Sequence, residues 1–155
     1  MPPSLDSRRE RILQHLVTTL TGIVAGTEYW NTVVTVTRSE NDIKPEENTD
    51  NWPLVLVSAN ELQGEVIELT NHEVQETLLV QVYGFIKAAL GDNLSQNTER
   101  MIADLVKALE TDPRRGGLAD ATDITTVVST YDDNTLVLEA GVIARVMFVR
   151  NRAEP

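Results

Sequence analysis

The chain has 155 residues, which suits a single domain over residues 1–155 with a core that needs no covalent cross-link. It has no cysteine, which excludes disulfides and thiolate metal sites and favours a reducing compartment. The net charge of −11 argues against nucleic-acid binding, because phosphate contacts need clustered lysine and arginine. The polar N-terminus predicts no secretory signal, and no apolar stretch reaches the roughly 20 residues that span a bilayer.

The first predicted element is a helix from about Ser7 to Val24. Ser7 and Glu10 have the spacing of a capping box, in which each side chain binds a free amide of the first turn. Apolar residues then recur at helical spacing and form one stripe: Ile12, Leu13, Leu16, Val17, Leu20, Ile23 and Val24.

Strands and a long polar loop are predicted over residues 32–69. The β-branched run 32–37 predicts a strand, and residues 65–69 predict another. Residues 54–57 predict a strand that is apolar on both faces and therefore central in its sheet. The acidic loop 39–51 has little apolar anchoring, so we expect it to be mobile in the free protein.

The second half of the chain predicts a long strand, a helix and a hairpin. The strand covers residues 76–85, and the helix runs from about residue 95 to residue 109 before Asp112 and Pro113 stop it. Two further strands, 124–131 and 135–149, are joined by an Asp-Asp-Asn turn and form a C-terminal β-hairpin. Residues 150–155 are polar and expected to be frayed.

This order of elements predicts an α+β fold. Both helices are apolar along one stripe only, so we expect them to pack on one face of a mainly antiparallel sheet that ends in the hairpin. One face of the last strand is wholly apolar, which places that strand over the core.

Residues suited to catalysis or metal binding are few. His15 lies beside the apolar stripe of the first helix and is expected to be structural or at the surface, and His72 lies in a predicted turn. The chain has no Gly-x-Ser-x-Gly motif, P-loop or Gly-x-Gly-x-x-Gly fingerprint, and the acids of loop 39–51 lack the spacing of a calcium loop. The sequence therefore predicts no catalytic, cofactor-binding or metal-binding residues, and a protein that is not an enzyme.

The acidic residues are unevenly distributed. No lysine or arginine occurs between Lys44 and Lys87, whereas eight acidic residues do. One interpretation is a solvated surface that keeps the protein soluble. The other is a face that repels DNA or meets a basic partner, for which the candidates are Glu61, Glu65, Glu68, Glu73 and Glu76.

Five arginines are candidates for contacts with other subunits. Arg8, Arg9 and Arg11 oppose the dipole of the first helix, so we expect them to serve something other than helix stability. Arg114 and Arg115 lie on a glycine-rich turn. They either interact with the negative C-terminal end of the preceding helix or form ion pairs with carboxylates of a neighbouring subunit.

The two tryptophans are also candidates. Trp30 and Trp52 stand just before the first and second predicted strands. A tryptophan at such a place either closes a core or anchors an interface, and both possibilities remain open for each of them.

The element order and several sequence segments resemble a known family. The segments are Trp-Pro-Leu-Val-Leu-Val at 52–57, Leu-Glu-Thr-Asp-Pro-Arg-Arg-Gly-Gly at 109–117, and Gly-Val-Ile-Ala-Arg-Val-Met-Phe-Val at 141–149. Over nearly the whole chain, this layout resembles the tail-terminator (tail-completion) proteins of long-tailed bacteriophages, the group typified by the minor tail protein U of phage lambda.

The resemblance implies a structural protein that forms a hexameric ring, caps the tail tube, ends its polymerisation and docks to the head connector. The implied partners are further copies of the chain, the tail tube protein and the head connector, without a membrane or specific nucleic-acid binding. The implied location is the head-proximal end of the virion tail, after assembly in the host cytoplasm. In such a ring, we expect the five candidate glutamates to face the lumen and repel DNA, and the candidate arginines to lie at subunit or tube contacts.

Two alternatives stay open at this point. A neck or head-completion protein of the phage connector shares the small α+β build. From another class, a small acidic ligand-binding module or ligand-binding enzyme subunit also fits. A ring of six favours the terminator, whereas a monomer with a deep pocket favours the binding module.

Overall fold

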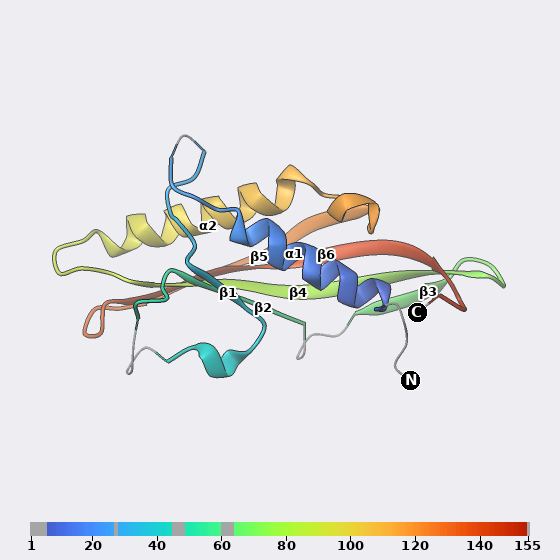
Figure 1. Cartoon of the computed structure of the whole chain (residues 1–155), viewed down its shortest axis with the longest axis horizontal. Coiled ribbons are helices and arrows are strands. Elements are labelled where there is room, and N and C mark those ends of the chain that lie inside the picture. Colours follow the sequence, from blue (N-terminus) through green and yellow to red (C-terminus); the bar gives the residue numbers. More distant parts are fainter. Residues whose placement is uncertain (1–5, 27, 45–48, 60–63, 155) are drawn as a thin grey trace.

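The computed structural model describes residues 6–26, 28–44, 49–59 and 64–154. Within them the chain forms two α-helices and a six-stranded sheet, which confirms the α+β prediction (Figure 1). In chain order the elements are α1 (Arg8–Thr21), β1 (Thr35–Thr37), the 3₁₀ turn η1 (Glu40–Asp42), β2 (Leu54–Ser58), β3 (Glu65–Glu68), β4 (Glu73–Lys87), α2 (Leu94–Thr111), the 3₁₀ turn η2 (Arg115–Gly117), β5 (Ala121–Asp132) and β6 (Val137–Asn151).

The sheet is mainly antiparallel, as predicted. Its strand order is β1-β2-β4-β6-β5, and β3 pairs with the end of β4 that β2 does not reach. Only the short β1 runs parallel to its neighbour, β2. The strands β5 and β6 form the predicted C-terminal hairpin, and both helices lie on the same face of the sheet (Figure 1).

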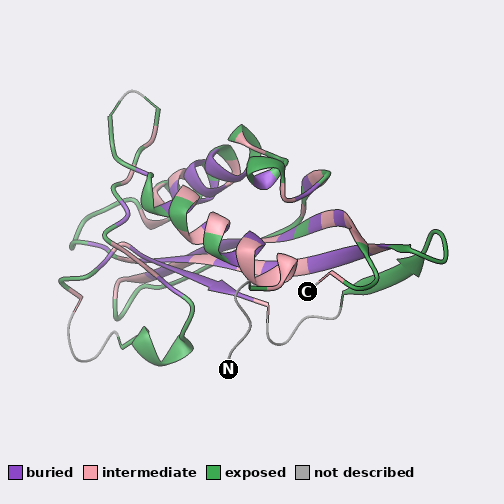
Figure 2. Cartoon of the chain, turned by 45° about the vertical axis from the view of Figure 1, so that its right-hand side comes forward, coloured by how far each residue is buried: buried purple, intermediate pink, exposed green. Residues whose placement is uncertain are grey.

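The main core lies between the helices and the sheet, where buried residues line the facing surfaces (Figure 2). Alternation along β6 gives this core five inward side chains, namely Ala140, Val142, Ala144, Val146 and Phe148, and Leu138 in the same phase is also buried. On β4, Gly84 lets α2 approach closely, because a Cβ there would lie 2.7 Å from the sulfur of Met101. The apolar stripes predicted from the sequence therefore meet one continuous sheet face.

A smaller cluster lies at the opposite face of the sheet. It contains Trp52, Leu54, Leu56 and Phe85, and Ile43 packs against it from the segment that follows η1. Burial of β2 on both faces confirms its prediction as an internal strand. The predicted mobile loop 39–51 is thus held at Ile43, whereas residues 45–48 of it lie outside the described residues.

The C-terminal end differs most from the sequence-based prediction. Residues 150–154 are not frayed: β6 continues to Asn151, and the backbone N–H of Arg152 donates to the carbonyl of His72 at 2.8 Å. The first helix ends at Thr21 rather than Val24, where the N–H of Gly22 donates to the carbonyl of Thr19 and the N–H of Ile23 donates to that of Leu20.

Candidate functional site

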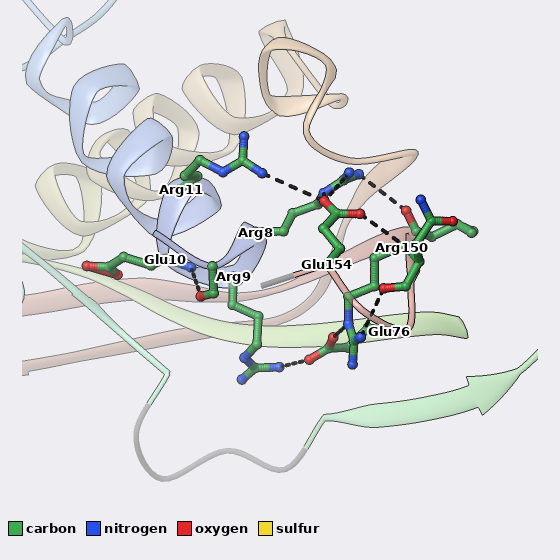
Figure 3. Close-up of polar contacts among 10 residues, drawn as sticks. Arg8, Arg9, Glu10, Arg11, Glu76, Arg150 and Glu154 are labelled. Atoms are coloured by element: carbon green, nitrogen blue, oxygen red, sulfur yellow. Dashed lines mark hydrogen bonds and ion pairs between the residues drawn. The ribbon is translucent and has the colours of Figure 1, made fainter. Parts of the chain in front are cut away.

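A cluster of ion pairs joins the start of α1 to the first residues of β4, the last residues of β6 and the segment that follows β6 (Figure 3). Glu76 on β4 accepts a hydrogen bond from Arg9 at 2.7 Å and another from Arg150 at 2.8 Å. Its side chain is only 7% exposed. Burial raises the pKa of Glu76, but the hydrogen bonds from Arg150 and Arg9 outweigh burial and hold the pKa below its ordinary value. Glu76 is therefore ionised and fully engaged within the chain.

A second carboxylate of the cluster comes from the C-terminal segment. Glu154 accepts from the Arg8 guanidinium at 2.7 Å and lies 3.7 Å from that of Arg11. Arg8 also donates to the carbonyl of Val149 at 3.2 Å. Arg8 and Arg11, which oppose the helix dipole, thus contact a carboxylate from the other end of the chain, and Arg9 binds Glu76 on β4. These contacts give the three arginines a role within one subunit. A role for them in subunit contacts stays a prediction.

The glutamates predicted to face a lumen differ in their exposure to solvent. Glu76 is buried between two arginines, so its assignment to an open acidic wall is wrong. Glu61 lies outside the described residues. Glu65, Glu68 and Glu73 are exposed on β3 and at the start of β4, where Glu68 pairs with Arg152.

The two arginines of the glycine-rich turn have different environments. Arg115 is completely buried, and its Nη2 donates to the carbonyls of Leu109 and Asp112 at the end of α2. Burial lowers its pKa, against the opposing effect of Asp112. Arg115 therefore caps its own helix, and the prediction that it pairs with a neighbouring subunit is wrong. Arg114 is exposed.

The two tryptophans also separate. Trp52 is buried, with its ring centroid 6.0 Å from that of Phe85, so it closes the smaller cluster and cannot anchor an interface. Trp30 is 62% exposed. The guanidinium carbon of Arg100 on α2 lies 4.4 Å from the centroid of its ring. Trp30 therefore remains a candidate interface residue, whereas sequence context alone did not distinguish the two.

His15 forms the arrangement closest to a catalytic one. Its Nδ1 lies 3.4 Å from the hydroxyl of Thr19, and its Nε2 lies 3.5 Å from a carboxylate oxygen of Asp112. The same oxygen accepts the N–H of Gly116 at 2.7 Å, so it already serves the η2 turn. Burial and the charge of Arg115 lower the pKa of His15, which keeps the imidazole neutral at pH 7. The group links α1 to η2, as a structural histidine does.

Large apolar side chains are exposed toward both ends of the long axis and also on the edge strand β5, at Val127 and Tyr131. At one end the β3–β4 hairpin projects beyond the helices and carries Val66, Ile67 and Leu69 (Figure 1). Toward the other end, the segment between α1 and β1 rises above the sheet and carries Val24 and Trp30, and Leu90 lies on the turn before α2. Sequence reasoning missed the hairpin residues, although the apolar pair 66–67 between Glu65 and Glu68 is visible in the sequence.

No protein-family model matches this chain, and no curated protein is similar enough to be reported as a relative. Neither α1 nor α2 has the length and apolar content that a membrane crossing requires. Among the residues that the structure describes, no three histidine, aspartate or glutamate side chains gather in a way that could hold a metal ion.

Proposed function

We propose that this chain is a structural assembly protein of a bacteriophage tail. It forms a ring that caps the tail tube, ends the polymerisation of the tube and presents the surface to which the head docks. Its partners in this role are further copies of itself, the tail tube protein and the head connector. The role places the protein at the head-proximal end of the virion tail, after assembly in the host bacterial cytoplasm.

The observation that carries the proposal is the exposure of large apolar side chains at separate places on one small protein, including two toward opposite ends of its long axis. Exposed apolar surface commonly marks sites of protein–protein contact. When two different surfaces of one chain bind each other, the contact is heterologous and repeats from subunit to subunit. Such a contact closes into a ring when the rotation between subunits permits it. The resemblance to tail terminators adds the expected number of subunits and the tube as the ring's substrate.

Light scattering across protein concentration tests the proposal. We expect exchange between the 17.2 kDa monomer and a species of about six chains, with the larger species favoured at high concentration. A two-fold dimer under every condition contradicts the proposal, because an isologous contact uses up the surface that a ring requires. A permanent monomer also contradicts it and favours a small binding module instead.

A further inference from the structure

The backbone at Trp30 is anchored by hydrogen bonds, whereas its side chain is 62% exposed. Its backbone N–H donates to Asp104 at 2.9 Å, and the backbone and side chain of Asn31 donate to the same carboxylate at 2.8 and 2.9 Å. Asp104 is only 1% exposed, and burial of a carboxylate is costly unless such hydrogen bonds compensate it. A buried carboxylate thus anchors the backbone at Trp30, whose side chain belongs to neither described core cluster.

Two cations lie over the aromatic rings of this segment. Arg100 covers the ring of Trp30, and the ammonium of Lys107 lies 5.6 Å from the ring centroid of Tyr29. Within the described part of the chain, neither cation is within ion-pair distance of a carboxylate. We call these four residues the cation–aromatic patch. Tryptophan, tyrosine and arginine are the residue types that contribute most to binding energy at protein interfaces.

The β3–β4 hairpin has the complementary character. All four residues of β3 are exposed, and Val66 and Ile67 point to opposite faces because side chains alternate along a strand. Glu65 and Glu73 lie on the same hairpin and form no ion pair among the described residues. A surface that only repelled DNA would have no use for exposed valine and isoleucine. Acidic and apolar side chains together are suited to a partner that offers cations and aromatic rings.

We infer that the β3–β4 hairpin of one copy docks on the cation–aromatic patch of the next copy. The two surfaces lie toward opposite ends of the molecule (Figure 1). They differ in charge, so a two-fold contact of hairpin with hairpin would oppose acid to acid, whereas a head-to-tail contact pairs Glu65 or Glu73 with Arg100. The inference rests on the proposed ring and assigns its subunit contact. It replaces the lumen role that the sequence suggested for these glutamates.

A mixing experiment tests the contact without requiring the ring to form. Trp30→Ala removes the anchor of the patch, and Ile67→Lys places a cation in the hairpin that meets the patch. Each variant alone should associate at least about tenfold more weakly than the wild-type chain, the effect expected of interface anchors. Mixed together, they retain one intact hairpin and one intact patch, so native mass spectrometry should show one-to-one heterodimers that grow no further.

A charge exchange identifies the polar half of the contact. Arg100→Glu alone should weaken association by about tenfold, and Glu65→Arg in the same chain should restore part of the loss. Arg145→Glu is the matched control, because it makes the same charge change at an exposed arginine of β6 that belongs to neither surface. Circular dichroism of each variant establishes that it is folded.

The outcomes separate this inference from the proposed function. If the wild-type chain forms rings and the Trp30→Ala and Ile67→Lys variants form them equally well, the assigned contact is wrong but the proposed ring stands. A wild-type chain that never associates overturns both. Heterodimers in the mixture, with rescue by the charge exchange and no effect of Arg145→Glu on association, support both.

Discussion

Replacement of Glu76 by glutamine should destabilise the fold, because one carboxylate holds two arginines from different elements. Charge-assisted hydrogen bonds contribute about 1.5–3 kcal/mol each, and removal of one partner from a fully buried ion pair costs about 3–5 kcal/mol. Here the arginines are partly hydrated, since the side chains of Arg9 and Arg150 are 43% and 24% exposed. Glutamine also keeps one acceptor. We therefore expect the free energy of unfolding to fall by about 1.5–3 kcal/mol.

Urea unfolding followed by circular dichroism measures this loss, and the m-value should stay constant if the two-state transition is preserved. Glu68→Gln is the matched control. The side chain of Glu68 is 75% exposed and pairs with Arg152 at the surface, so its replacement should change the free energy of unfolding by less than about 0.5 kcal/mol. Equal effects of the two substitutions would refute the buried role of Glu76.

The remaining predictions concern pH, packing and charge. The pKa of Glu76 in the folded protein lies below its ordinary value of 4.5, so its contribution to stability should be present above about pH 4.5 and disappear as the pH falls further. In acid unfolding experiments, the decrease in the free energy of unfolding at low pH should therefore be smaller for Glu76→Gln than for the wild-type chain. Arg115→Ala should lower the free energy of unfolding by about 2–4 kcal/mol in urea titrations, whereas Arg114→Ala should change it by less than about 0.5 kcal/mol. Gly141→Ala should lower the melting temperature, because its Cβ would lie 2.0 Å from a ring carbon of Tyr83. The purified protein should not retard duplex DNA in gels even at low salt, and tight retardation would contradict the reasoning from net charge.

The fold was largely predictable because its elements have strong local patterns. Helical spacing fixes the stripes of α1 and α2, and strict alternation fixes the inward face of β6. The strand order was not predictable from these patterns, because β4 pairs with β6 through contacts between residues far apart in the sequence. The C-terminal segment looked frayed for the same reason, since its order depends on Glu154 meeting Arg8 at a separation of 146 residues.

The candidate residues show where sequence reasoning fails. The alternation along β4 places Glu76 on the inward face with Leu78 and Val80, so its burial could have been predicted from the sequence. Its ion pair with Arg9 could not, because the two residues are 67 positions apart in the chain. Arg114 and Arg115 are adjacent on one turn, and only the φ of +50° at Arg115 and its packing under α2 separate them. A charged residue's role therefore depends on long-range contacts that local patterns do not encode.

Negative-stain electron microscopy of the purified protein, at a concentration where light scattering detects the large species, tests directly whether the chain forms a ring. We expect ring-shaped particles whose averaged images show about six-fold symmetry around a central opening. Compact two-fold particles, or single chains without any ring at every concentration, would contradict the proposed ring.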